Sequence, residues 1–490
     1  MSLIDLDKLK SILLYDSQAP LIFNSGLFLW LFLAFLGVYI LLRKQHTARI
    51  MFVTLFSYYF YYKSSGFYFF LLALVTCVDF SLARLMNRVD RPSDRKFLVG
   101  LSLGVNLGLL AYFKYTNFLA SSFANLLDLS FQPWDIFLPV GISFFTFQSL
   151  SYTIDVYRGK IKPLTNLLDY AFYVSFFPQL VAGPIVRAKD FIPQIRKPLL
   201  VTDAMFNRGL YLILSGLIKK AVISDYISVN FVERIFANPS LYSGVENLMG
   251  VYGYALQIYC DFSGYSDMAI GLALLLGFHF PINFDSPYQS SSITEFWRRW
   301  HISLSGWLKD YLYISLGGNR KGKVRQYANL FITMFLGGLW HGASWNFIVW
   351  GCLHGVALIL HKLWMGLTKG IKKNRVGQLL GIVITFHFVC FSWIFFRNTS
   401  FDHSMVMLEQ IINVFKPELL IQLLVGYKEV FFLILLGYIA HALPRKVEAY
   451  LIKGISWLPF LGKVFLIVSV IYLVIQVKSS SIQPFIYFQF

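Results

Sequence analysis

Long apolar segments alternate with short connections along almost the whole chain. A helix that crosses the hydrocarbon core of a bilayer needs about 20 predominantly apolar residues, and many of these segments approach that length. The pattern therefore predicts an all-α polytopic membrane protein with about 11–13 membrane segments. The predicted segments are residues 21–42, 50–62, 66–83, 97–119, 136–156, 167–186, 207–231, 248–279, 327–361 (as a pair of helices), 376–396, 428–443 and 457–477.

Two of these segments contain residues that a simple membrane crossing would exclude. Residues 167–186 contain two prolines and have basic connections on both sides, which favours a broken or re-entrant helix. Lys219 and Lys220 interrupt residues 207–231. Charge and irregular backbone are tolerated at membrane depth only where protein or a water-filled cavity surrounds them. Both segments therefore favour a hollow protein core over a plain bundle of helices.

Composition and charge agree with a membrane protein. Of the 490 residues 57% are hydrophobic and 14% are charged, whereas a soluble domain carries roughly 25% charged residues. The formal net charge of +18 comes from Lys and Arg gathered in alternate connections, which is the positive-inside pattern. We therefore predict that the basic connections face the cytoplasm and anionic lipid, and we expect no nucleic acid partner. The basic connections are residues 43–49, 84–96, 158–162, 187–197, 298–325, 362–375 and 445–453; those between them include 114–135, 233–246 and 397–429.

Neither the cysteines nor the histidines predict a metal site. The four cysteines all lie in apolar stretches and form no C-x-x-C pair, so neither a disulfide framework nor a thiolate site is indicated. His354 and His361 lack the i, i+4 spacing and the nearby carboxylate of a zinc-protease helix. We expect these two histidines to pack or to cap, and we expect no bound metal.

The N-terminal residues 1–20 differ from the rest of the chain. Apolar residues alternate there with polar ones, which predicts a short amphipathic helix on the membrane surface rather than a cleavable signal peptide. We predict an N-terminal extension over 1–20 and one membrane-embedded domain over 21–490.

Two histidines in aromatic, glycine-containing segments, His301 and His341, are the leading candidates for chemistry. An ionisable side chain within a membrane is costly and usually functional, and histidine exchanges protons near neutral pH. Basic connections flank residues 327–361, so both ends of this pair should be cytoplasmic. Residues 327–341 then climb about 22 Å at 1.5 Å per residue, which predicts that His341 lies deep in the membrane, next to a turn at Gly342.

A different location is predicted for His301. Trp297, Trp300, Leu304, Leu308 and Tyr311 follow the i, i+3, i+4 spacing of one helix face, which predicts a continuous aromatic-rich helix at the cytoplasmic interface. His301 would lie at the cytoplasmic mouth and His341 in the interior, with a path between them.

Each candidate also has a simpler interpretation. His341 could act as a general base on a hydroxyl that attacks an acyl carbonyl, or it could be bonded to a backbone carbonyl in a helix pair. His301 could support that chemistry, or it could be bonded to a lipid headgroup at the interface.

A basic turn at residues 317–323 formally matches G-x-x-x-x-G-K. Val324 replaces the Ser or Thr that would hold magnesium, so this turn is no P-loop. Arg320, Lys321 and Lys323 could instead hold the phosphates of an anionic donor at the cytoplasmic mouth. An ordinary positive-inside connection remains the alternative.

Two aspartates, Asp261 and Asp267, lie in an apolar stretch. Their six-residue offset separates them by about 120° on a helix, so they do not form a catalytic dyad. We predict polar cross-links between helices instead.

Six stretches of the chain match one known family: residues 21–26, 176–184, 259–271, 295–323, 336–346 and 484–490. Together they resemble the membrane-bound O-acyltransferase family, in the branch that contains the membrane subunit of alginate O-acetylation. The resemblance covers nearly the whole chain from residue 21.

The resemblance implies a ring of helices around a funnel or tunnel. It implies that His341 is the family's catalytic histidine and His301 its second characteristic polar residue, with Trp340, Asn346, Trp297 and Arg298 shaping the site. It also implies an acyl thioester donor, cytoplasmic acetyl-CoA in this branch, with no permanently bound cofactor. The acetyl group would pass across a bacterial cytoplasmic membrane, with a periplasmic acetyltransferase partner, to polysaccharide hydroxyls.

Three alternatives remain open. The D-alanyltransferases of teichoic acid synthesis share parts of these motifs but use a carrier-protein thioester. A transporter or scramblase could use the same cavity, although the hydropathy contains no inverted repeat and the sequence no chain of carboxylates. A scaffold for a periplasmic transferase would need neither histidine.

Overall fold

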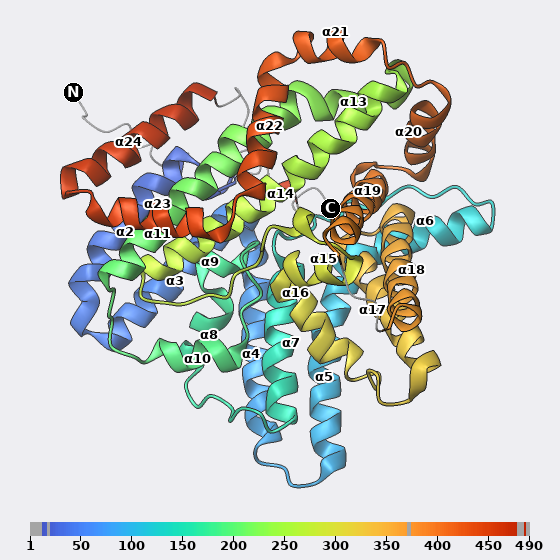
Figure 1. The fold of residues 1–490 in the computed structure, drawn as a ribbon. Coiled ribbons are helices and arrows are strands. Elements are labelled where there is room, and N and C mark those ends of the chain that lie inside the picture. The colour runs from blue at the N-terminus through green and yellow to red at the C-terminus, as the bar shows by residue number, and fades with distance from the viewer. Residues whose placement is uncertain (1–11, 17–19, 370–373, 478–484, 487–490) are drawn as a thin grey trace. The chain divides into compact units, whose positions relative to one another are not determined.

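The computed structural model describes residues 12–16, 20–369, 374–477 and 485–486. Every regular element in this part of the chain is helical, which confirms the predicted all-α class (Figure 1). The predicted amphipathic helix over 1–20 falls mostly outside the described residues. The chain divides into two compact units, residues 1–209 with 269–281, and residues 210–268 with 282–490. Two helices, α11 (Asp203–Leu217) and α14 (Gly244–Leu275), contribute residues to both units.

The first unit holds the N-terminal helices. Of these, α4, α5 and α7 pack on one another. A buried carboxylate, that of Asp79, joins α4 to α5 by accepting hydrogen bonds from Ser102 Oγ at 2.7 Å and Asn106 Nδ2 at 2.8 Å. The described helices of this unit are α2 (Gly26–Leu41), η1 (Leu42–Lys44), α3 (His46–Ser65), η2 (Gly66–Tyr68), α4 (Phe69–Met86), α5 (Pro92–Leu110), η3 (Ala111–Tyr115), α6 (Thr116–Leu126), α7 (Ile142–Tyr157), α8 (Leu167–Ser175), α9 (Phe177–Leu180) and α10 (Ala188–Ile195), together with parts of α11 and α14.

The second unit holds the segments with both candidate histidines. Its described helices after α11 are η4 (Ile218–Ser224), α12 (Asp225–Ile227), η5 (Ser228–Val232), α13 (Glu233–Ala237), η6 (Pro239–Leu241), most of α14, η7 (Pro287–Gln289), α15 (Ile293–Arg299), α16 (Ile302–Trp307), η8 (Leu308–Tyr313), α17 (Gly322–His341), α18 (Trp345–Leu367), α19 (Arg375–Arg397), α20 (Phe401–Asn413), α21 (Leu419–Gly426), α22 (Lys428–Ala442), α23 (Arg445–Trp457) and α24 (Phe460–Val477).

Among the described residues, six helical stretches are long and apolar enough to cross a membrane, and the bent pair α21–α22 would make a seventh. This confirms a multi-pass membrane protein. Most of the other predicted segments coincide with helices that are broken, irregular or contain charged residues, and the predicted count of 11–13 stays a prediction. The six stretches are Gly26–Lys44, His46–Met86, Pro92–Leu126, Trp345–Leu367, Arg375–Arg397 and Phe460–Val477.

The predicted break within residues 167–186 is confirmed. Helix α8 ends at Ser175 and α9 restarts at Phe177, with Pro178 in its first turn. The freed backbone N–H of Phe177 donates to Ser57 Oγ at 3.1 Å, and its ring packs among phenylalanines of α2 and α3 such as Phe35 and Phe56. The backbone N–H that the break leaves without a helical partner is therefore hydrogen-bonded within the protein, as irregular backbone in an apolar environment requires.

The lysines that interrupt residues 207–231 are held by buried or partly buried carboxylates. Lys220 Nζ lies 2.7 Å from Asp225 Oδ1 and 2.6 Å from Asp261 Oδ1. Lys219 Nζ lies 2.7 Å from Asp267 Oδ2. The expectations that protein surrounds these lysines and that Asp261 and Asp267 cross-link helices are both confirmed.

Two glycines allow the backbones that carry these ion pairs to approach closely. A Cβ atom added to Gly216 would lie 2.5 Å from the carbonyl oxygen of Gly264. A Cβ atom added to Gly264 would lie 2.8 Å from the carbonyl oxygen of Gly216. Any larger residue at either position would push the end of α11, and η4 directly after it, away from α14 and separate the ion pairs.

We expect Lys220→Met to destabilise the protein by about 3–5 kcal/mol, because it leaves two carboxylates without their cation. Chemical unfolding of the purified protein in detergent measures the loss, with the exposed Lys446→Met as the control. The triple variant Lys220→Met/Asp225→Asn/Asp261→Asn should recover much of the loss, since it removes every charge of the group. A Lys220→Met protein as stable as the wild type would contradict the expectation.

Candidate active site

The predicted hairpin around His341 is confirmed. Helix α17 ends at His341, Gly342 is extended, and α18 begins at Trp345. The two helices approach closely at Gly338 and Gly351. A Cβ atom added to Gly338 would lie 2.3 Å from the carbonyl oxygen of Phe347 and 2.9 Å from the Cα atom of Gly351. Gly342 is also required by space, since a Cβ atom there would lie 2.0 Å from the ring of Phe347. The glycines that flank His341 therefore fix the position of the turn.

Aromatic rings surround the imidazole of His341. Its ring centroid lies 5.0 Å from that of Trp340, 5.0 Å from that of Trp350 and 5.2 Å from that of Phe396. His341 is only 3% exposed. The hairpin thus holds the imidazole in an apolar enclosure, where electrostatic interactions are stronger than in water.

His301 is held by an asparagine from another segment. Its Nδ1 lies 3.1 Å from Asn283 Oδ1, and the same oxygen accepts hydrogen bonds from the backbone N–H and the hydroxyl of Ser303 at 3.2 and 2.9 Å. The amide nitrogen of Asn283 donates to Ser266 Oγ at 3.1 Å. The Asn283 side chain is therefore fixed on both of its polar atoms.

This arrangement determines the tautomer of the His301 ring. A backbone N–H can only donate, so the atom that Ser303 N–H contacts must be the oxygen of Asn283. His301 Nδ1 must then carry a proton and donate it to that oxygen. In the neutral ring the lone pair is on Nε2, which is the nitrogen that could accept a proton.

The prediction of one continuous helix through His301 is wrong. Helix α15 ends at Arg299, and His301 has φ 42° and ψ 56° before α16 begins at Ile302. The N–H of Ile302 donates to the backbone carbonyl of Asn283 at 2.9 Å. Bonds from a distant segment thus stabilise a left-handed residue that the local spacing could not predict.

The alternative in which His301 is bonded to a lipid headgroup is also wrong, because its side chain is 0% exposed. Its ring packs edge-on against Phe262, with centroids 4.6 Å apart. The ring of Trp340 lies 6.1 Å from that of His301, and the same indole contacts His341. One tryptophan therefore links the two candidate histidines within a single aromatic cluster.

His354 packs in the same cluster, as expected, and its hydrogen bonds are all used. Trp297 Nε1–H donates to His354 Nδ1 at 3.3 Å, and His354 Nε2 lies 3.0 Å from Ser392 Oγ. The single hydroxyl proton of Ser392 goes to the carbonyl of Val389 at 2.8 Å, so His354 Nε2 must be the donor. This ring is a neutral structural link between Trp297 and α19 and has no lone pair left for catalysis.

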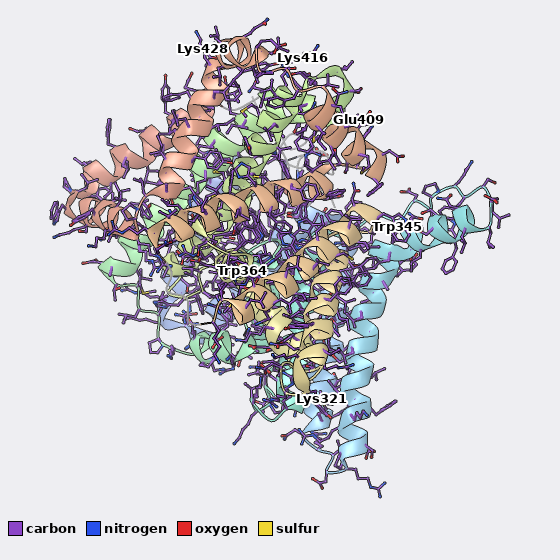
Figure 2. All side chains as sticks on the ribbon, turned by 45° about the vertical axis from the view of Figure 1, so that its right-hand side comes forward. Lys321, Trp345, Trp364, Glu409, Lys416 and Lys428 are labelled. Atoms are coloured by element: carbon purple, nitrogen blue, oxygen red, sulfur yellow. The ribbon has the colours of Figure 1, made fainter. Side chains whose placement is uncertain are left out.

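The remaining predicted site residues divide into two groups. Asn346 is buried and donates to the carbonyl of Asn398 at 2.8 Å, so it ties the start of α18 to the end of α19, where Phe396 contacts His341. Arg298, Arg320 and Lys321 are exposed. Lys321 lies at the opposite end of the α17–α18 hairpin from Trp345 (Figure 2). The 20 residues of α17 put about 30 Å of helix between Lys321 and the end that carries His341.

Sequence reasoning did not identify the support behind His301. Phe262 contacts the His301 ring on one side and Phe485, near the C-terminus, on the other, with centroids 5.5 Å apart. The backbone N–H of Ile486 donates to Asp261 Oδ2 at 3.0 Å. No sequence pattern points to Asn283, because it is a single asparagine in a connection between helices.

Comparison with known proteins places the chain in a family. Residues 160–401, which include both histidines, match the model of the membrane-bound O-acyltransferase family. The chain is 36% identical to the "Probable alginate O-acetylase AlgI" of Pseudomonas putida, over 96% of this chain and 100% of the relative. It is 35% identical to the peptidoglycan O-acetyltransferase of Helicobacter pylori, over 80% of each. It is 30% identical to the teichoic acid D-alanyltransferase of Bacillus subtilis, over 55% of this chain and 71% of the relative.

Burial of His301 gives a prediction about pH. Burial lowers the pKa of His301 from 6.5 to about 3. Between about pH 6.5 and pH 3 the imidazole of His301 is protonated in the unfolded chain but neutral in the folded chain. The free energy of unfolding that this difference contributes is therefore fully present above about pH 6.5 and is lost as the pH falls below it. We expect His301→Gln to lessen this loss by up to about 1.4 kcal/mol per pH unit.

Chemical unfolding in detergent at about pH 7.5 and 5.5 checks this expectation. His403→Gln, at an exposed position in α20, is the matched control. Equal loss of stability on acidification in the wild type and in His301→Gln would contradict it.

Proposed function

Because this chain belongs to the membrane-bound O-acyltransferase family and is an O-acyltransferase, we propose that it transfers an acetyl group from cytoplasmic acetyl-CoA towards an exported polysaccharide, with His341 as general base. The observation that carries the proposal is the buried imidazole of His341 at the end of α17, enclosed by Trp340, Trp350 and Phe396.

The reaction requires one proton acceptor. The hydroxyl oxygen of the acceptor attacks the thioester carbonyl while His341 takes the hydroxyl proton. The new C–O bond forms and the C–S bond breaks, and the protonated imidazole returns its proton to the leaving thiolate. The products are an acetyl ester and the free thiol of coenzyme A, and His341 is neutral again.

His301 is proposed as a supporting residue. Its fixed tautomer leaves Nε2 as the nitrogen that can accept a proton, and its ring contacts Trp340. These contacts support a role in proton transfer or in arranging the wall that receives the thioester.

Arg320 and Lys321 are proposed to hold the phosphates of the donor. Both are exposed, and the length of α17 separates them from the end that carries His341 (Figure 2). A donor whose charged nucleotide stays in water while its thioester extends into the apolar interior fits this separation. Guanidinium and ammonium groups are common ligands of phosphate.

The acceptor side of the proposal comes from the relatives. Their names describe O-acetylation of alginate and of peptidoglycan. We propose a polysaccharide acceptor outside the cytoplasm, a periplasmic acetyltransferase partner that delivers the acetyl group, and a location in the bacterial cytoplasmic membrane.

We expect His341→Ala to lower acetyl transfer by about 10²–10⁴-fold, since a positioned general base contributes a factor of that size. Acetyl and D-alanyl esters on the extracted cell-surface polymers are measured in cells that carry each variant, with membrane insertion confirmed. His403→Ala is the control. Full acetylation with His341→Ala would refute the base and favour a scaffold, and loss of D-alanyl esters alone would favour a carrier-protein donor.

We expect Arg320→Gln/Lys321→Gln to raise the KM for acetyl-CoA about 25-fold with little change in kcat, because each lost phosphate contact costs about 1 kcal/mol, or about a fivefold factor. Initial rates in purified membranes over a range of acetyl-CoA concentrations give both constants. The control is Arg88→Gln/Arg91→Gln, which removes two exposed cations from another basic connection. An unchanged KM would remove these residues from the donor site.

A further inference from the structure

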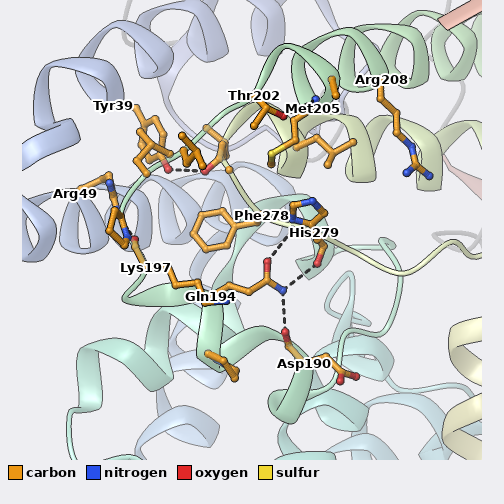
Figure 3. Close-up of a pocket in the computed structure, with 18 of the residues that line it drawn as sticks. Tyr39, Arg49, Asp190, Gln194, Lys197, Thr202, Met205, Arg208, Phe278 and His279 are labelled. Carbon is orange, nitrogen blue, oxygen red and sulfur yellow. Dashed lines mark hydrogen bonds between the residues drawn. The ribbon is translucent and has the colours of Figure 1, made fainter.

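A cavity of about 1080 Å³ lies within the first unit, at one end of two candidate membrane spans (Figure 3). Tyr39 comes from the last part of the stretch Gly26–Lys44, and Arg49 from the first turn of the stretch His46–Met86. The other walls are α10 with the segment that follows it, the start of α11, and the end of α14 with the residues that follow it. The cavity therefore lies near the level where two predicted spans leave the membrane.

Hydrogen bonds within the walls hold the cavity open. Gln194 donates to the carbonyls of Asp190 at 2.8 Å and His279 at 3.2 Å, and its own carbonyl accepts from the N–H of His279 at 2.8 Å (Figure 3). Tyr39 donates its hydroxyl proton to the carbonyl of Leu276 at 2.7 Å. These bonds join α10 and the span that carries Tyr39 to the segment that follows α14, so they fix three walls of the cavity to one another.

Positive charge predominates in the lining. Four cationic side chains, Arg49, Lys189, Lys197 and Arg208, stand against one carboxylate, Asp190. Arg49 is buried and donates to the carbonyls of Arg43 and Lys197, so it mainly fixes the wall. The other three cations are exposed and can turn towards an anion.

Apolar side chains complete the lining and continue along the rim. Leu199, Leu274 and Phe278 line the cavity. Leu200, which also lines it, is 70% exposed. A free phosphate would leave this apolar surface uncovered, whereas the acyl chains of a lipid would bury it.

We propose that this cavity binds the phosphate headgroup of an anionic phospholipid, with the acyl chains lying over the apolar rim. Basic pockets beside membrane helices on the cytoplasmic side attract such headgroups. Three cations of the lining, Arg49, Lys189 and Lys197, belong to connections 43–49 and 187–197, which the charge pattern assigns to that side. The proposal goes beyond acyl transfer and uses none of the groups assigned to it.

The test titrates short-chain phosphatidylglycerol into the purified full-length protein in neutral detergent and follows the thermal unfolding midpoint. A ligand that binds the folded state raises this midpoint. Phosphatidylcholine, inorganic phosphate and coenzyme A are titrated in parallel. We expect phosphatidylglycerol to raise the midpoint and the other three to have little effect, and we expect added salt to weaken the rise.

The variant Lys189→Gln/Lys197→Gln/Arg208→Gln should bind phosphatidylglycerol roughly a hundredfold more weakly, because each cation near an anionic lipid contributes about a fivefold factor. Arg88→Gln/Arg91→Gln/Lys96→Gln removes the same charge from the connection between α4 and α5 and should bind as the wild type does. Equal effects of the two lipids, equal losses in the two variants, or a stronger response to phosphate or coenzyme A would each overturn the proposal. The wild-type lipid and salt titrations decide the case even if the variant fails to fold.

Discussion

The carboxylate of Asp261 is the constraint behind the candidate site. One of its oxygens is paired with Lys220 and the other accepts the backbone N–H of Ile486. It therefore fixes η4, α14 and the segment near the C-terminus to one another in an apolar environment, where unpaired charge is very costly. The next residue, Phe262, packs between Phe485 and His301. The position of the histidine thus depends on a charge that never contacts it.

Hydropathy and charge predicted most of the helices and the hairpin, because burial in lipid constrains every residue of a span. The break at Pro178 and the turn at Gly342 were also predictable, since proline and glycine act locally. The left-handed conformation of His301 was not predictable, because it depends on bonds from Asn283, 18 residues away. The pairing of Lys220 with Asp261 depends in the same way on the close approach of Gly216 and Gly264.

Residue type alone also could not separate the roles of the histidines. His354 and His301 are both fully buried in the same aromatic cluster. The neighbours of His354 use both of its ring nitrogens, as a donor and as an acceptor, whereas Asn283 fixes the proton of His301 on Nδ1. This difference comes from Trp297, Ser392 and Asn283, three side chains that only folding brings to the rings. Such partners fix which ring nitrogen of each histidine carries the proton.

His341 is the last residue of α17, and this has an electrostatic consequence. The final carbonyl groups of a helix have no partners within the helix and give its C-terminal end a partial negative charge. An imidazolium formed there is stabilised by that field, whereas the neutral ring gains almost nothing. In the proposed reaction the imidazolium of His341 would therefore form within the field of the helix that carries it.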